Sequence, residues 1–248
     1  MARIFLITGR IGSGKSTVSC LLKQRGFYVV SLDDFAKALM TREDAMIMYL
    51  KLFGKDSLNE DLTINLNYLR NNFFKPQNTL KRQDFERFLW AQFDDFLYDT
   101  AKKMKGPVFV EAAETPFCVK VFSQLDDYAG KIVVRCDDDV RIARVKKRSG
   151  LTEEQIKERD ALQYDSPLTD KDVLITNEGS VDDLDVVIRD MLNGKLKFTL
   201  EEYADVFKTC IAGAPPSVIF PTWCCFYRKN KGCLYCPLPC DNPKQKIK

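Results

Sequence analysis

Residues 9–16 read GRIGSGKS, and this stretch decides the fold. It matches the pattern G-x-x-x-x-G-K-[ST], in which the backbone N–H groups of a glycine-rich loop surround a phosphate. The glycines let the backbone approach an anion with no Cβ in the way, and Lys15 adds a positive charge. A hydroxyl at the position of Ser16 is the usual protein ligand of Mg²⁺ beside a nucleoside triphosphate. The sequence therefore predicts a phosphate-binding P-loop.

The segments on either side of this loop have the pattern that it requires. Residues 3–8 (RIFLIT) form a short apolar run, which is typical of a buried parallel strand. From Lys15 to Arg25 apolar residues recur at helical spacing, and Gly26 follows as a C-terminal cap. The loop therefore opens a helix whose N-terminus lies on the phosphates. We expect ATP to contact the loop and the first helical turn, at Gly12, Ser13, Gly14, Lys15, Ser16 and Thr17.

Length and composition limit the classes of protein that remain. The chain has 248 residues, of which 45% are hydrophobic, enough for one α/β domain and an appendage. The net charge of +3 argues neither for nor against an anionic partner. There is no signal-peptide pattern and no apolar run of the roughly 18 residues that span a bilayer, so we expect a soluble, cytoplasmic protein. The absence of His excludes every mechanism that needs an imidazole base, so proton transfer must rely on carboxylates, lysine or water.

Strands and helices alternate along the chain, which predicts an α/β fold of the P-loop kinase type. The expected architecture is a doubly wound parallel sheet of about five strands, with helices on both faces and the site at the carboxyl ends of the strands. A helical insertion is expected over residues 43–104, where inserted helices commonly form the acceptor-substrate region of P-loop kinases. The aromatic stripe of the long helix at 80–104 is more typical of core than of a ligand site. The predicted strands are residues 3–8, 27–31, 106–111, 131–136 and 172–177.

An acidic pair, Asp33 and Asp34, follows the second predicted strand at the start of a helix. A carboxylate just past the strand next to a P-loop is well placed to face the transferring phosphate. It can accept a proton from an attacking hydroxyl or orient that hydroxyl. Capping of the helix is the alternative, because helix N-termini favour the same residue type. We favour a catalytic role for one of the pair.

Two glutamates, Glu111 and Glu114, lie at the exit of the third predicted strand. A carboxylate at this place can hold Mg²⁺ through water, as the acidic residue after a Walker B strand does. A solvated loop explains the two residues equally well. The three aspartates at 137–139 follow the fourth strand at a helix start, so we prefer helix capping to metal binding for them.

Residues 140–165 carry a dense set of charges, and Gly150 and Thr152 divide the segment into two helices. In phosphoryl-transfer enzymes a mobile basic lid closes over the nucleotide, neutralises charge on the transferring group and excludes water. A solvated helical face with ion pairs between residues four apart is the alternative. We favour the lid, whose basic residues are Arg141, Arg144, Lys146, Lys147, Arg148, Lys157 and Arg159.

Together these segments resemble the dephospho-CoA kinase family over residues 1–192. ITGRIGSGKSTVSCLL (7–22) looks like the start of the family, and DDFAK (33–37) is similar to its D-E-I-A-R stretch. The resemblance implies ATP- and Mg²⁺-dependent phosphorylation of the ribose 3′-hydroxyl of dephospho-CoA, the last step of coenzyme A synthesis. It makes Asp33 the catalytic carboxylate, assisted by Lys15 and Arg148. The sequence is also similar to the family's lid and to its loop near the adenine (ITNEGS, 175–180). The matching residues are Arg144, Arg148, Arg159 and Gln163 in the lid and Asn177 in the loop.

The departures from the family lie on the acceptor side. An Asp that the family has two residues before the catalytic one is Ser31, and its His-Pro pair falls at Trp90-Ala91. The family's Pro-Leu-Leu-Phe-Glu segment is replaced by EAAET at 111–115. The runner-up is therefore a phage-type deoxynucleoside monophosphate kinase, which shares the P-loop and a similar Ile-Thr-Asn-x-Gly-Ser end. A hypothesis of another class is a nucleotide-binding protein that has lost transferase activity.

Residues 195–248 lie outside the resemblance and form a basic, Cys-rich extension of the expected kinase domain at 1–194. Structural Zn²⁺ is one hypothesis for this extension, since a C-x-x-C pair is typical of zinc sites. Free or oxidised thiols are nearly as plausible. Lipidation of Cys224 or Cys225 and contact with nucleic acid are weaker ideas. The candidate zinc ligands are Cys224 (or Cys225), Cys233, Cys236 and Cys240.

Overall fold

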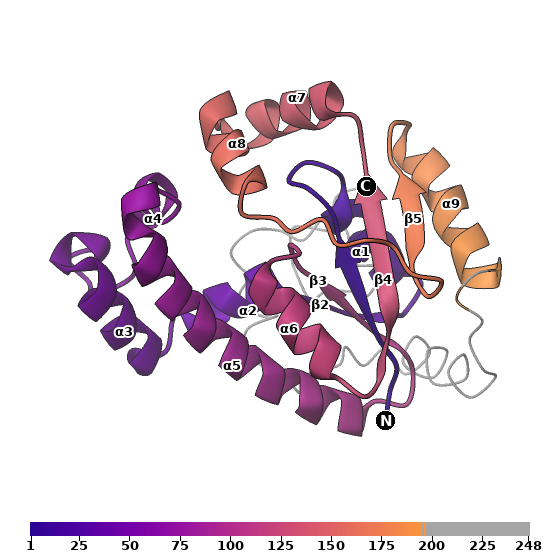
Figure 1. Ribbon diagram of the computed structural model, residues 1–248, viewed down its shortest axis with the longest axis horizontal. Helices are drawn as coiled ribbons and strands as arrows, with labels where there is room; N and C mark the ends of the chain where they lie inside the picture. The colour runs from indigo at the N-terminus through magenta and orange to yellow at the C-terminus, as the bar shows by residue number, and fades with distance from the viewer. Residues whose placement is uncertain (195, 197–248) are drawn as a thin grey trace, which may run out of the picture.

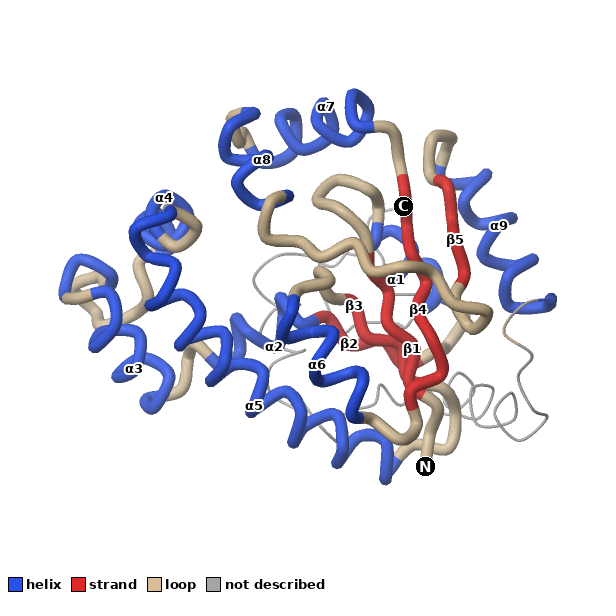
Figure 2. Tube along the Cα trace, in the orientation of Figure 1, coloured by secondary structure: helices blue, strands red, loops and turns tan. Residues whose placement is uncertain are grey.

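The computed structural model describes residues 1–194 and residue 196. Its centre is a five-stranded sheet in the order β2-β3-β1-β4-β5, and every neighbouring pair of strands is parallel (Figure 2). This arrangement confirms the predicted α/β class and the five strands. The strands are β1 (Ile4–Thr8), β2 (Tyr28–Ser31), β3 (Val108–Glu111), β4 (Tyr128–Arg135) and β5 (Val173–Thr176).

Helices cover both faces of the sheet (Figure 1). On one face lie α1 (Lys15–Gln24) and α9 (Val181–Gly194), and on the other lie α5 (Thr79–Lys103) and α6 (Pro116–Gln124). Successive side chains of a strand point to opposite faces, so Phe5 and Ile7 of β1 join the core under α1, while Ile4 and Leu6 join the core under α5. This two-sided burial explains why β1 is apolar without interruption from Ile4 to Ile7.

Helix α6 is an element that the sequence-based expectation missed. Its start carries a recognisable signal, because the Thr115 hydroxyl accepts a hydrogen bond from the Cys118 N–H at 3.2 Å and Pro116 occupies the first turn. The helix is only nine residues long, and it buries Cys118 and Phe122 against the sheet. A segment this short shows too few helical repeats for its periodicity to be read.

The helical insertion after β2 has a hydrophobic core of its own. Tyr49, Phe53, Phe73 and Phe85 pack together in it, and Figure 1 shows α3 and α4 away from the sheet, joined to it by α5. The predicted aromatic stripe of α5 is core, as expected: Phe85 packs in the insertion, whereas Phe93 and Leu97 pack under the sheet. The remaining elements here are α2 (Leu32–Leu39), α3 (Glu43–Phe53), η1 (Lys55–Ser57), α4 (Leu66–Asn72) and η2 (Pro76–Asn78).

The segment after β4 forms two helices above the carboxyl ends of the strands, α7 (Asp138–Ser149) and α8 (Glu153–Asp160) (Figure 1). The break falls where the sequence predicts it. Gly150 ends α7 with a φ of 63°, and Thr152 opens α8 with a capping box. Val145, Leu151 and Ile156 form a small core with Ile11, so the two helices pack directly against the P-loop. None of the helices in residues 1–194 is long and apolar enough to cross a membrane.

Candidate active site

The P-loop joins β1 to α1, and its shape depends on glycine. Gly14 has a φ of 103°, and a Cβ there would lie 2.0 Å from Nδ2 of Asn177. A Cβ at Gly12, whose φ is 82°, would lie 2.6 Å from the carbonyl oxygen of Arg141. Helix α1 begins at Lys15, and no side chain caps its first N–H groups. These donors and the positive end of the helix can therefore bind phosphate oxygens.

Lys15 folds back across its own loop. Its Nζ donates hydrogen bonds to the carbonyl oxygen of Gly9 at 2.7 Å and to that of Arg10 at 3.2 Å. Burial lowers the pKa of the ammonium, and the charges of Glu111 and Asp33 oppose that shift. The predicted lysine, the predicted acid and a glutamate that sequence reasoning left undecided are thus brought together at the same edge of the sheet.

Asp33 lies in the first turn of α2 with its side chain exposed. The cap of this helix is Ser31 instead, because its hydroxyl accepts a hydrogen bond from the Asp34 N–H at 3.4 Å. Asp34 pairs with Lys37 at 3.0 Å. Asp33 is therefore not needed as a cap, and its carboxylate acts on Lys15.

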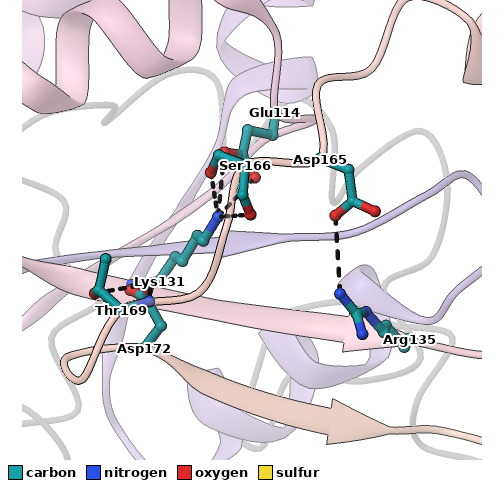
Figure 3. A network of polar contacts seen from close by, with 7 residues as sticks. All are labelled: Glu114, Lys131, Arg135, Asp165, Ser166, Thr169 and Asp172. Atoms are coloured by element: carbon teal, nitrogen blue, oxygen red, sulfur yellow. Dashed lines mark hydrogen bonds and ion pairs between the residues drawn. The ribbon is translucent and has the colours of Figure 1, made fainter.

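The two glutamates after β3 have different surroundings. Glu111 is half-buried beside α1, and burial raises its pKa. Glu114 is fully buried and pairs with Lys131 of β4, with 3.3 Å between Nζ and Oε1 (Figure 3). Ser166 completes the cluster, donating its hydroxyl to Glu114 and accepting from Lys131. A solvated loop is therefore the wrong interpretation for Glu114, whose charge is neutralised inside the protein.

Asn177 lies just past β5 and supports the P-loop. Its side chain is buried, and Nδ2 donates a hydrogen bond to the carbonyl oxygen of Ser13 at 2.8 Å. The guanidinium of Arg144 donates to the backbone oxygen of Asn177 at 3.1 Å and lies 3.4 Å from the sulfur of Cys136. The structure thus joins three of the predicted ATP-side residues, the Ser13 backbone, Arg144 and Asn177, in one network.

The two-helix segment after β4 contributes charge to the site. Arg148 is exposed at the end of α7, and its charge acts on Lys15. Arg159, on α8, lies over the ring of Phe74 at 4.9 Å, which is a cation–π contact between this segment and the helical insertion. Lys146 and Lys157 both pair with Glu153, so part of the segment does form the solvated ion pairs that were the alternative.

Arg141 is a structural residue that sequence reasoning placed among the basic lid side chains. It is buried, with ion pairs to Asp138 at 2.6 Å and to Asp160 at 2.7 Å, and its Nη1 donates to the carbonyl oxygen of Ile11 at 3.4 Å. It therefore ties α7 and α8 to the P-loop. The spacing Asp138-x-x-Arg141 is a signal for one of these pairs, but the partner Asp160 lies too far along the chain to be found.

One of the departures from the family pattern on the acceptor side can be located in the structure. Trp90, at the position of the expected His, is buried in the core of the sheet against Phe93.

No group of three acidic, Cys or His side chains suited to a metal occurs among the residues that the structure describes. The four cysteines proposed as zinc ligands, Cys224, Cys233, Cys236 and Cys240, lie outside the described residues.

The fold and the loop define a class first: an α/β kinase that binds a nucleoside triphosphate on a P-loop. A model of the dephospho-CoA kinase family matches residues 3–183, and the chain belongs to this family. As a member of a kinase family, it uses ATP and Mg²⁺ and acts on a small molecule.

Individual relatives agree with this assignment. The dephospho-CoA kinase of Corynebacterium efficiens is 31% identical over 194 residues, which cover 74% of this chain and 92% of the relative. The dephospho-CoA kinase of Geobacillus kaustophilus is 28% identical over 187 residues, covering 70% and 87%. The solved structure of TT1252 from Thermus thermophilus superposes with a TM-score of 0.59 at 26% identity, covering 77% of this chain and 97% of that one.

Proposed function

We propose that this chain transfers the γ-phosphoryl group of ATP to the 3′-hydroxyl of dephospho-CoA, the last step of coenzyme A synthesis. The observation that carries the proposal is the position of the Asp33 carboxylate, which acts on the Lys15 ammonium at the carboxyl edge of the sheet. A lysine that binds the γ-phosphate and a carboxylate beside it are what transfer to a hydroxyl requires. Family membership supplies the identity of the acceptor.

On the ATP side, we assign phosphate binding to the backbone N–H groups from Gly12 to Thr17. Lys15 exchanges its bonds to the loop carbonyls for bonds to the β- and γ-phosphates. The donor set suits Mg²⁺, because the exposed Ser16 hydroxyl and the nearby carboxylates offer the hard oxygen ligands that this ion takes. When bound, the ion neutralises charge on the phosphates. Arg144 and Asn177 hold the adenine side of the loop in place.

On the acceptor side, Asp33 accepts the proton of the attacking hydroxyl or orients that hydroxyl in line with the leaving oxygen. Its exposure suits this role, since a substrate has to reach it. Arg148 stabilises the charge that spreads over the equatorial oxygens during transfer. The helical insertion, residues 43–104, binds the rest of the acceptor, and residues 140–165 act as the lid.

The test is ADP release from Mg·ATP with each acceptor supplied separately. We expect turnover with dephospho-CoA and none with a deoxynucleoside monophosphate. Turnover on a deoxynucleotide alone would move the enzyme to the phage-type nucleotide kinases. ATP binding without turnover on any acceptor would identify a nucleotide-binding protein that has lost the transfer reaction.

The role of residues 195–248 rests on sequence spacing alone. Metal analysis of the purified chain tests the zinc hypothesis for Cys224, Cys233, Cys236 and Cys240, and a stoichiometry near zero would contradict it. Nucleic-acid contact by this extension and a cytoplasmic location stay predictions from the sequence.

A further inference from the structure

Arg141 touches the P-loop with its backbone and with its side chain. A Cβ at Gly12 would lie 2.6 Å from the Arg141 carbonyl oxygen and 2.6 Å from Cγ2 of Val145, so α7 packs on the loop without a gap. The guanidinium reaches the same stretch, because its Nη1 donates a hydrogen bond to the carbonyl oxygen of Ile11 at 3.4 Å. Arg141 is 3% exposed, so water has little access to these contacts.

The contact with Ile11 sets the direction of the next backbone N–H. In a trans peptide unit the C=O and the N–H point in opposite directions, and the Ile11–Gly12 bond is trans. A carbonyl oxygen of Ile11 that points toward Arg141 therefore turns the N–H of Gly12 away from α7. This N–H is the first of the donors, from Gly12 to Thr17, that we assign to the phosphates. Arg141 would thus orient a phosphate ligand that belongs to another residue.

Two carboxylates hold the Arg141 guanidinium in its place. Asp138 pairs with it at 2.6 Å from the same helix, and Asp160 pairs with it at 2.7 Å from the last turn of α8. The Asp138 side chain is exposed and also lies 3.9 Å from Arg10, whereas that of Asp160 is only 14% exposed. A shielded, charge-assisted hydrogen bond is weakened little by salt and water, so Asp160 is the firmer of the two partners.

The surroundings of Asp160 indicate more than a stabilising ion pair. Its Oδ2 pairs with Arg141, but its Oδ1 is buried and has no hydrogen-bond partner among the residues that the structure describes. A pair that served stability alone would be expected to satisfy both oxygens. The charge of Asp160 also acts on Lys15, so the pair lies beside the phosphate site. On the other side of this turn, Arg159 is fixed over the ring of Phe74.

We propose that Arg141 and Asp160 are positioning residues of the phosphate site: Asp160 holds the guanidinium against the P-loop, and Arg141 holds the Ile11–Gly12 peptide in the orientation that binds phosphate. Neither side chain is a catalytic residue, because both act through the backbone of the loop. The affinity of the loop for phosphate thereby depends on how α8 packs against α7. The proposal rests on the ATP side of the proposed function and not on the identity of the acceptor.

A role through charge alone predicts different results. Asp160 is a negative charge near a phosphate site, so its removal should tighten phosphate binding if only Coulomb repulsion matters. Arg141→Lys keeps the positive charge, so charge alone predicts no loss. Positioning predicts weaker phosphate binding in both cases. Lysine lacks the planar fork with which the guanidinium bonds to two carboxylates and the loop at once.

The experiment measures the affinities for ATP and for inorganic tripolyphosphate by calorimetry at one Mg²⁺ concentration. Tripolyphosphate carries the phosphates without the nucleoside, so it reports on the loop. We expect Asp160→Ala and Arg141→Lys each to weaken both ligands on the order of 10-fold, in the range of couplings between contacting residues. Glu153→Ala is the matched control, because Glu153 also joins α8 to α7 but does so in solvent, through Lys146. It should change neither affinity by more than about twofold.

An ATP affinity of Asp160→Ala equal to or tighter than that of the unmodified protein would overturn the inference, as would an Arg141→Lys affinity within about twofold of it. A loss for ATP that tripolyphosphate does not share would assign the pair to the nucleoside and would overturn it too. Circular dichroism checks the folded fraction, and where Asp160→Ala does not fold, Arg141→Lys decides. Absence of turnover on dephospho-CoA beside the expected losses would overturn the acceptor assignment and leave the positioning role standing.

Discussion

Lys15 lies among charges of both signs, and this sets what the site can bind. Burial lowers the pKa of its ammonium, Glu111 and Asp33 raise it, and Arg148 lowers it again. A phosphate that arrives at the loop replaces two carbonyl oxygens as the partner of the lysine. The two carboxylates therefore help to keep the lysine charged in a half-buried place.

Asp33→Asn is the residue change that tests proton transfer most directly. We expect kcat to fall on the order of 10²- to 10⁴-fold, the usual contribution of a general base, with ATP affinity changed less than about twofold. Steady-state kinetics and calorimetry on the same preparation separate the two quantities. Equal losses in both would indicate a structural role, which the cap already provided by Ser31 makes difficult to sustain.

Gly14→Ala tests whether the P-loop requires a residue without a side chain at position 14. The new Cβ would lie 2.0 Å from Nδ2 of Asn177, so we expect the hydrogen bond from Asn177 to Ser13 to break and ATP affinity to fall. Gly150→Ala is the matched control. Its φ of 63° is also left-handed, but no atom lies within 4 Å of the added Cβ, so only about 1–2 kcal/mol of backbone strain is expected.

Thermal unfolding and ATP calorimetry on both glycine variants measure these effects. An equal loss of ATP affinity in Gly14→Ala and Gly150→Ala would mean that backbone strain, and not the contact with Asn177, limits the loop.

A buried ion pair fixes the connection from α8 to β5 against the sheet. Lys131 is 4% exposed and Glu114 is 6% exposed, and Ser166 of the connection contacts both (Figure 3). The N–H of Tyr164 donates to the carbonyl oxygen of Glu114 at 2.7 Å, and Arg135 pairs with Asp165 at 4.0 Å. The two-helix segment α7–α8 is therefore anchored at its far end to the same loop that follows β3.

Lys131→Met should be strongly destabilising, because it leaves the Glu114 carboxylate buried without a counter-charge. Breaking a buried pair on one side costs about 3–5 kcal/mol. The double variant Lys131→Met/Glu114→Gln should recover most of that loss. Urea unfolding followed by fluorescence gives the free energies. A double variant no more stable than Lys131→Met would show that the volume of the lysine, and not its charge, is what the fold requires.

The sequence predicts an element well when the interactions that form it join residues that are close together in the chain. Local sequence patterns predict the P-loop, the strands and the break at Gly150, because a loop, an apolar run and a cap each span only a few residues. The buried pairs Lys131–Glu114 and Arg141–Asp160 join residues that are distant in sequence, and in the sequence they read as ordinary surface charges. The P-loop, Asp33 and Asn177 could be placed at one edge from the sequence, because each follows a strand of a parallel sheet. The buried ion pairs could not, because nothing local marks their partners.

At the scale of the whole molecule, the helical insertion and the two-helix segment α7–α8 extend from the same edge of one sheet. The insertion follows β2 and the segment α7–α8 follows β4, and these two strands lie on opposite sides of the P-loop strand β1. The two appendages meet where Arg159 lies over Phe74. If residues 43–104 bind the acceptor and residues 140–165 cover the nucleotide, as proposed, the two ligands would meet between these segments, beside Lys15 and Asp33.

The described core closes at Leu196, which predicts how much of the chain the reaction needs. Leu196 is 6% exposed in the cluster under α1 and α9, and Arg3 donates to its carbonyl oxygen at 3.4 Å, while the family match ends at residue 183. We expect a protein of residues 1–197 to keep the kcat and the thermal stability of the full chain. A protein of residues 1–194 lacks the buried leucine and should lose about 1.5–3 kcal/mol of stability.

Chemical denaturation and dephospho-CoA turnover of the two truncated proteins test this prediction together. Loss of turnover in residues 1–197 with unchanged unfolding would contradict it and give the extension a part in catalysis. Loss of stability in residues 1–197 would mean that residues beyond 197 complete the core. If both quantities are kept, neither phosphoryl transfer nor the stability of the described core needs residues 198–248.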